Sequence, residues 1–145
     1  MDKSRILISY SGKDAFEASL LQYAVEKVLA DLGVVAWTFQ RDQPRDEKNI
    51  ARSLKQIVRN SSIAVFLVSP DTLTSGATQW MELAYADAFG VPTFVLLHRL
   101  NFEDLKRKEG GVPPLLLSSQ CNAATDWMNV LRDVKKHLHG RKRHA

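Results

Sequence analysis

Apolar, β-branched runs alternate with amphipathic helical patterns along almost the whole chain. The run Ile63–Val68 constrains the fold most, because all six of its residues are apolar. A strand without polar positions has no face suited to water, so this run predicts a central parallel strand covered on both faces. Short connections between strands and helices predict right-handed crossovers.

Other segments complete this pattern. Four further strands are predicted at 5–9, 34–39, 92–97 and 115–117. Helical spacing of apolar residues predicts helices at 14–32, 49–60 and 78–89, and a last one capped by Thr125 with Trp127, Met128, Leu131, Val134 and Leu138 inside. Gly33 and Gly90 are expected to end helices, and the stretch from Ser69 to Gly76 to form a loop.

These elements predict an α/β fold, a flavodoxin-like three-layer sandwich around a central parallel five-stranded sheet of order 2-1-3-4-5. We expect one domain over 1–145, with a core at about 4–138 and a basic tail at 139–145. In this fold class ligands bind outside the carboxyl ends of the strands, beside strands one and three. The segments Ser9–Asp14 and Ser69–Glu82 therefore matter most, with the loop 40–48 beside them.

Charge and composition exclude several classes of function. The net charge is +4, and five of the 20 Lys and Arg residues lie between 135 and 143. We interpret this basic tail as a solvated chain end, so a nucleic-acid partner is not expected. No apolar run approaches the ~20 residues of a membrane span, and no signal peptide is evident, which predicts a cytoplasmic protein without a membrane partner.

Cysteine and histidine argue against a metal site. Cys121 is the one cysteine, which excludes an internal disulfide, and we expect it to be a buried thiol. Apart from a weak pair in the tail, the four histidines (His98, His137, His139 and His144) show no metal-ligand spacing with carboxylates. The sequence therefore predicts no metal site.

The loop Ser9–Asp14 combines hydroxyl groups, a glycine, the Lys13 cation and the free amides of a helix start. This combination suits an anion or a phosphate. The alternative is that Ser11 or Asp14 is an ordinary helix cap. The loop matches neither a P-loop nor a dinucleotide fingerprint.

Glu82 opens a helix at the edge where such a sheet binds ligands. With Thr78 as the N-cap, Glu82 lies near the first turn, where the helix dipole favours an ionised carboxylate. A simple charge-complementing role is the alternative to a role in a site. The charged loop Arg41–Lys48 is solvated surface on one interpretation and a lid or docking surface on the other.

Several of these segments resemble the Toll/interleukin-1 receptor (TIR) domain family of the bacterial type. Ile6–Asp14 is similar to its first box, a strand that leads into Ser-Tyr-Ser and then Lys-Asp. Arg41–Pro44 resembles the second box, in the BB loop, with Pro-Arg where Pro-Gly is usual. Val68–Pro70 looks like the end of the third strand, and Glu82–Ala86 followed by Phe89–Pro92 resembles the glutamate helix and its exit turn. The resemblance covers about residues 4 to 138.

The resemblance implies an enzyme that cleaves NAD⁺ between nicotinamide and ribose, with Glu82 as the catalytic carboxylate. NAD⁺ is then the substrate rather than a cofactor, and the product is ADP-ribose or a cyclic ADP-ribose. Substrate contacts are expected from Ser9, Tyr10, Ser11, Lys13, Trp37, Arg41, Ser69, Trp80 and Tyr85. Trp80 stands two residues before Glu82 where the family often has Trp four before it, and Trp37 is either an alternative aromatic wall or a core residue.

The resemblance also implies signalling in bacterial immunity, including antiviral defence, or in stress, with activation by self-assembly. Self-association or binding to other TIR domains would use the BB loop, Arg41–Lys48. Two further hypotheses stay open: a non-catalytic TIR–TIR interaction module, and a nucleoside deoxyribosyltransferase, a family that shares the sandwich and carries a similar Glu-helix pattern.

Overall fold

A five-stranded parallel sheet organises the chain. The structure is a computed structural model that describes residues 4–38, 50–108 and 111–144. Its strands run in the order β2-β1-β3-β4-β5, as expected, and are β1 (Arg5–Ser9), β2 (Val35–Thr38), β3 (Ile63–Val68), β4 (Thr93–Leu97) and β5 (Gln120–Ala123). Because every neighbouring pair is parallel, all carboxyl ends meet at one edge of the sheet.

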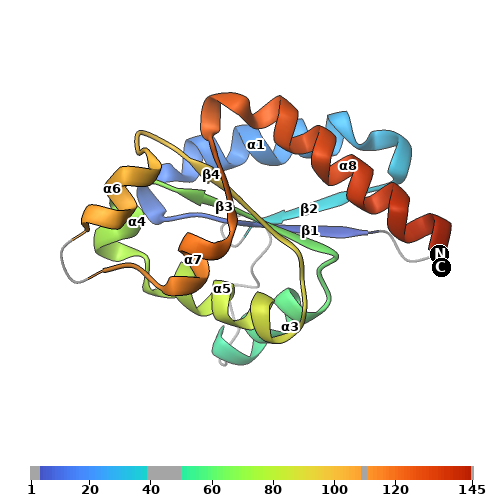
Figure 1. Ribbon diagram of the computed structural model, residues 1–145. Helices are drawn as coiled ribbons and strands as arrows, with labels where there is room; N and C mark the ends of the chain where they lie inside the picture. The colour runs from blue at the N-terminus through green and yellow to red at the C-terminus, as the bar shows by residue number, and fades with distance from the viewer. Residues whose placement is uncertain (1–3, 39–49, 109–110, 145) are drawn as a thin grey trace.

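Helices cover both faces of the sheet (Figure 1). One layer contains α1 (Ala15–Val28) and α8 (Trp127–His144), and the other contains α3 (Ile50–Arg59) and α5 (Ala77–Ala88). Shorter elements connect them: the 3₁₀ turns η1 (Gly12–Asp14), η2 (Ala30–Leu32) and η3 (Ala124–Asp126), and the helices α4 (Pro70–Ser75), α6 (Phe102–Arg107) and α7 (Pro114–Ser118). This is the predicted three-layer sandwich.

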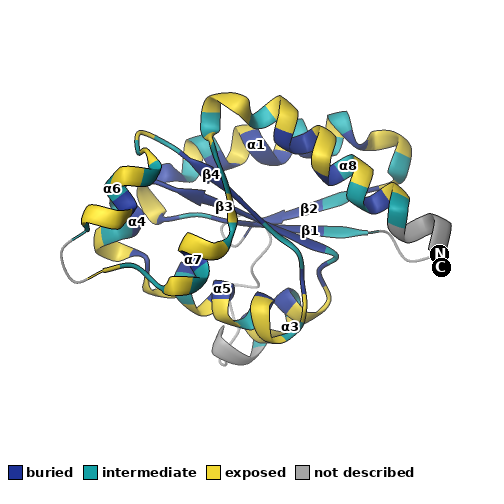
Figure 2. Ribbon diagram, in the orientation of Figure 1, coloured by how far each residue is buried: buried dark blue, intermediate teal, exposed yellow. Residues whose placement is uncertain are grey.

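Alternation along the strands divides the core into two clusters. In β1, Ile6 and Ile8 pack with residues of α1 and α8, whereas Leu7 packs on the other face among residues of α3 and α5. All six residues of β3 are buried, and Figure 2 shows the central strands buried between helices with exposed outer sides. The prediction that β3 is central is confirmed.

Two glycines end helical segments as predicted. Gly33 follows η2 with φ 64°, and Gly90 follows α5 with φ 68°. Both lie in the left-handed region, where a glycine has no Cβ to strain the backbone.

The prediction of a strand at 115–117 was wrong. These leucines belong to α7, which begins at Pro114, and β5 follows at Gln120–Ala123. A proline fits the first turn of a helix because its missing N–H would be unpaired there. The true strand escaped prediction because it pairs only with β4 among the described strands, and such a strand does not need the apolar run of a central one.

The stretch after β3 is also helical rather than a loop. Pro70 begins α4, and the backbone N–H of Ser69 donates to Thr72 Oγ1 at 3.1 Å. At the other end of the chain, Thr125 lies within η3, so α8 starts at Trp127. Met128 is 46% exposed rather than inside, because its position lies off the helix face that buries Val130, Leu131, Val134 and Leu138.

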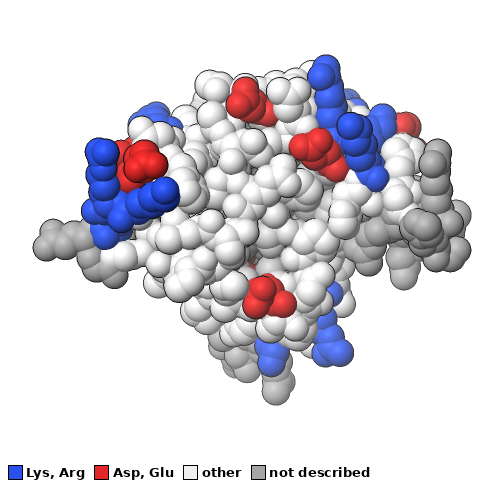
Figure 3. All heavy atoms as spheres, viewed as in Figure 1, with Lys and Arg blue, Asp and Glu red and all other residues white. Residues whose placement is uncertain are grey.

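The surface shows no dominant charge on the face in Figure 3. Lys and Arg side chains lie over α6 and α8, next to Asp and Glu, and the middle of that face is mostly uncharged. No helix in the described ranges is both long enough and apolar enough to span a membrane.

Candidate active site

Glu82 lies on the inner side of α5, facing the sheet. The buried positions of α5 are 79, 82, 83 and 86, the spacing of one helix face. Glu82 Oε1 accepts a 3.0 Å hydrogen bond from the hydroxyl of Ser9, the last residue of β1. The two residues are 3% and 1% exposed. A carboxyl group is therefore held in the interior at the carboxyl edge of the sheet.

Burial changes the charge of this carboxyl group near neutral pH. It raises the pKa of Glu82 to about 7, while the hydrogen bond from Ser9 opposes this with a smaller effect. Desolvation penalises the charged form because low-dielectric surroundings replace water. A carboxyl group of this kind exchanges its proton in the range where acid–base and electrostatic catalysis operate.

The expected position of Glu82 in its helix was wrong in one respect. The residue before α5 is Gly76 rather than Thr78, so Glu82 is the sixth helical residue and not part of the first turn. The helix dipole acts mainly within the first turn. A charge-complementing role for Glu82 therefore has little support.

The loop after β1 donates hydrogen bonds to a carboxylate of the same chain, that of Asp71. The Ser11 hydroxyl and the Lys13 backbone N–H, the latter at 3.3 Å, both donate to Asp71 Oδ2 at the start of α4. The hydrogen bond from Ser11 is the main reason that the pKa of Asp71 is lowered. The donors predicted to hold an anion thus converge on one carboxylate oxygen.

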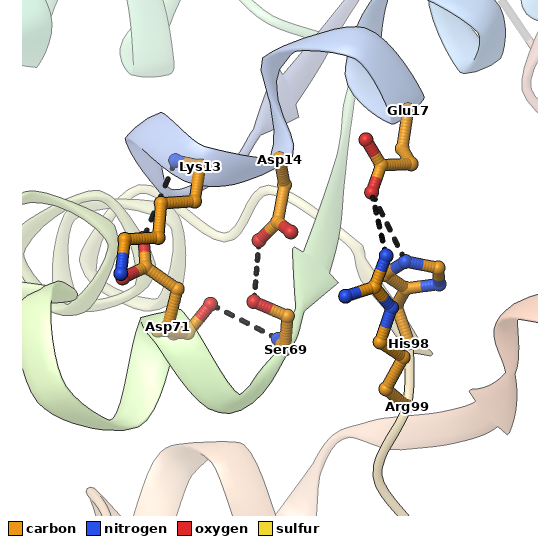
Figure 4. Close-up of polar contacts among 8 residues, drawn as sticks. Lys13, Asp14, Glu17, Ser69, Asp71, His98 and Arg99 are labelled. Atoms are coloured by element: carbon orange, nitrogen blue, oxygen red, sulfur yellow. Dashed lines mark hydrogen bonds and ion pairs between the residues drawn. The ribbon is translucent and has the colours of Figure 1, made fainter.

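Ser69 and Asp14 form a second pair beside this one. The Ser69 hydroxyl donates to Asp14 Oδ2, and both residues are buried. Ser11 and Asp14 do occupy the N-cap positions of η1 and α1, but neither side chain caps its own helix. Figure 4 shows how these contacts join the loop after β1 to the start of α4.

A cleft of about 380 Å³ opens at this edge, which we call the carboxyl-edge cleft. Its wall includes the Ser69–Asp14 pair described above, together with Lys13 and Asp71. The lining residues are Lys13, Asp14, Ser69, Pro70, Asp71, Thr74 and Arg99. Its wall therefore carries both positive and negative groups.

The predicted aromatic residues lie at different depths. Trp37 is 8% exposed and belongs to the core cluster of α3 and α5, so its interpretation as a core residue is favoured. Trp80 and Tyr85, both on α5, are half-buried against the same cluster. Tyr10 packs against the opposite cluster, that of α1 and α8. The structure therefore brings Ser9 to Glu82, whereas Tyr10 lies against the other core cluster.

A sequence model of the TIR domain matches residues 6–133. The chain belongs to the TIR domain family. No curated protein matches the sequence significantly.

Solved structures show the same fold at low sequence identity. The TIR domains of the activated Roq1 resistosome, which directly recognises the pathogen effector XopQ, align with a TM-score of 0.58 and 15% identity over 96% of this chain and 80% of that one. A conserved protein from Enterococcus faecalis aligns with a TM-score of 0.66 and 16% identity, over 94% and 99%. A 2-desoxiribosyltransferase from Leishmania mexicana aligns with a TM-score of 0.59 and 16% identity, over 83% and 89%.

Gln79 of this TIR domain was not among the predicted site residues. It lies one turn before Glu82 on the same face of α5 and is 1% exposed. Its Nε2 donates to Leu67 O at 3.0 Å, and its Oε1 has no hydrogen-bond partner among the described residues. The signal in the sequence was the helical spacing from Glu82, which puts Gln79 on the buried face.

Two further predictions concern Arg41 and Cys121. Arg41 and the rest of the BB loop, Arg41–Lys48, lie outside the described residues. Cys121 lies in β5 and is half-buried rather than buried, because β5 lies at the margin of the sheet.

Proposed function

We propose that this TIR domain cleaves NAD⁺ at the bond between nicotinamide and ribose, with Glu82 as the catalytic carboxylate. The observation that carries the proposal is the Glu82–Ser9 pair, a buried carboxyl group at the sheet edge where ligands bind in this fold class. Membership of the TIR family supports it.

The chemistry needs only one carboxylate. As the bond from ribose C1′ to the nicotinamide nitrogen breaks, the bonding electrons leave with nicotinamide and positive charge develops on the ribose. An ionised carboxylate fixed nearby stabilises that charge. Water then adds to C1′ and releases a proton, or a nucleophile within the same molecule attacks C1′ and closes a ring. Nicotinamide leaves as a neutral molecule, so a strong general acid is not required.

The pKa of Glu82 predicts how such an activity depends on pH. The ionised form is the one that stabilises a cation, and it becomes the major form only above about pH 7. Nicotinamide release at subsaturating NAD⁺ should therefore rise as the pH increases through about 7.

The test is nicotinamide release from NAD⁺ at high protein concentration, with mass spectrometry of the product. Glu82→Gln keeps the shape of the side chain and removes its charge, and should reduce the rate at least 100-fold, the scale typical of a lost electrostatic stabiliser. Glu103→Gln on α6 is the matched control, since that carboxylate is exposed, and it should leave the rate unchanged. Equal rates for Glu82→Gln and the unmodified protein would contradict the proposal.

A second candidate function is a non-catalytic module that associates with other TIR domains. The observation that favours it is the low exposure of Glu82, which a substrate must reach. In this case NAD⁺ stays intact at every protein concentration, while light scattering detects association that charge reversal at Arg41 or Arg45 abolishes.

The likeness to a desoxiribosyltransferase requires one more assay. Incubation with a deoxynucleoside and a second free base distinguishes the two enzyme classes. Transfer of deoxyribose between bases without action on NAD⁺ would replace the proposal with the transferase function.

A further inference from the structure

Three potential metal ligands meet outside the Glu82–Ser9 pair. Asp14 and Glu17 lie three residues apart at the start of α1, and His98 directly follows β4. One ligand atom from each lies within 4.8 Å of the other two. Figure 4 shows the carboxylate of Glu17 directed at His98, with Asp14 on the neighbouring turn. The tertiary structure thus forms the donor set that the sequence spacing of the histidines did not predict.

Asp14 is the unusual member of this set. It is 5% exposed, and among the described residues its carboxylate accepts one hydrogen bond, from the neutral hydroxyl of Ser69 to Oδ2. Among the described residues no Lys, Arg or His nitrogen forms an ion pair with its carboxylate. Its second oxygen points toward the Glu17 side in Figure 4. Buried carboxylates are normally paired with a cation or bind a metal ion, and among the described residues Asp14 Oδ1 has no hydrogen-bond partner.

The other two ligands already have nearly the required spacing. His98 Nε2 and Glu17 Oε2 are 3.1 Å apart, and two ligand atoms ~2.1 Å from a tetrahedral ion are roughly 3.4 Å apart. Arg99 Nη2 lies 3.8 Å from the same Glu17 oxygen, but Arg99 is 73% exposed. An exposed ion pair of this kind contributes little to stability, so the guanidinium can move into solvent when a metal ion binds.

We propose that Asp14, Glu17 and His98 bind a divalent transition-metal ion, with Zn²⁺ as the best match. One imidazole nitrogen and two carboxylate oxygens suit zinc, whereas Mg²⁺ and Ca²⁺ prefer larger sets of oxygen ligands. Water completes the coordination from the solvent side. The ion neutralises Asp14 and ties the first turn of α1 to the end of β4.

Metal titration of the full chain after treatment with a chelator tests the proposal. Isothermal titration with Zn²⁺ should show one saturable site, and Co²⁺ should give the visible absorption of a tetrahedral complex. Glu17→Gln and His98→Asn should each weaken the affinity at least about tenfold and abolish the cobalt spectrum. Zn²⁺ should also raise the melting temperature of the unmodified protein and not that of either variant.

The histidines near the end of the chain require a control, because they also bind metals. The double variant His137→Asn/His139→Asn leaves Asp14, Glu17 and His98 intact and should keep the site and its spectrum. If the double variant loses binding while Glu17→Gln and His98→Asn keep it, or if no saturable binding occurs, the proposal is wrong. Asp14→Asn should weaken binding as well, and circular dichroism checks that each variant folds.

Discussion

Glu82 shows how strongly the surroundings of a single residue set its chemistry. The residue is 3% exposed on the inner face of α5 and accepts a hydrogen bond from Ser9. Burial raises its pKa to about 7, from an ordinary value of 4.5. In the folded protein the carboxyl group therefore keeps its proton over a pH range in which the unfolded chain loses it. Such a difference links the charge of this one residue to the stability of the whole fold.

Glu82→Gln should change the pH dependence of stability. Below about pH 4.5 both states of the unmodified chain carry the proton, so the raised pKa has no effect. As the pH rises from there to about 7, the unfolded state loses the proton first, and the free energy of unfolding falls by on the order of 3 kcal/mol. Glutamine cannot ionise and avoids this loss.

Urea unfolding at pH 5 and pH 8 measures the effect. The stability of Glu82→Gln relative to the unmodified chain should increase between these two values. A difference that stays constant with pH would show that the pKa of Glu82 is not raised in the folded protein.

At the scale of elements, the junction between α4 and α5 positions the candidate site. The helix α4 presents Asp71 to the loop after β1, and α5 presents Glu82 to Ser9. Gly76 alone separates the two helices. A Cβ atom at this position would lie 2.2 Å from the backbone oxygen of Thr72 and 2.9 Å from its Cγ2. The close approach of α4 to the start of α5 therefore requires a glycine.

Gly76→Ala should destabilise the fold by about 1–3 kcal/mol, because the backbone of α4 must shift to avoid the clash. Gly12→Ala is the matched control, since a Cβ at Gly12 has no atom within 4 Å, and its effect should stay below about 1 kcal/mol. Chemical denaturation gives both values. Equal stability of the two variants would mean that the junction tolerates a side chain.

At the scale of the whole molecule, α1 presents an apolar stripe to solvent. Phe16, Leu20 and Tyr23 follow helical spacing and are 72%, 56% and 64% exposed. Leu20 also borders an apolar pocket of about 280 Å³ beside Trp127. Apolar surface of this kind is typical of sites of protein association. It agrees with the expectation, implied by the family resemblance, that this TIR domain associates with further copies.

If assembly precedes activity, as the resemblance implies, nicotinamide release should rise more steeply than in proportion to protein concentration. Leu20→Lys on the stripe should shift the rise to higher concentrations by at least tenfold, since a charge would be buried on association. Leu117→Lys on α7 is the control, as an exposed leucine away from α1. A specific rate that is independent of concentration, together with light scattering of a monomer, would exclude activation by assembly.

The amino-acid sequence by itself determined the architecture. Unbroken apolar strands such as β3 must be covered on both faces. The strand–helix alternation then predicts the strand order 2-1-3-4-5, which the structure has. The same reasoning located the edge of the sheet at which Ser9 and Glu82 meet. It did not find α4, α6 or α7, and it misplaced β5, because short elements away from the sheet centre have weak periodicity and depend on their neighbours.

Only the tertiary structure decided which polar side chains become partners. Ser69 pairs with Asp14 across 55 residues, Ser11 with Asp71 across 60, and His98 with Glu17 across 81. A local pattern predicts which face a residue occupies, but not the partner that packing brings to it from a distant element. The buried environment of Glu82 and the meeting of Asp14, Glu17 and His98 arise in the same way, from strands and helices that end side by side at one edge of the sheet.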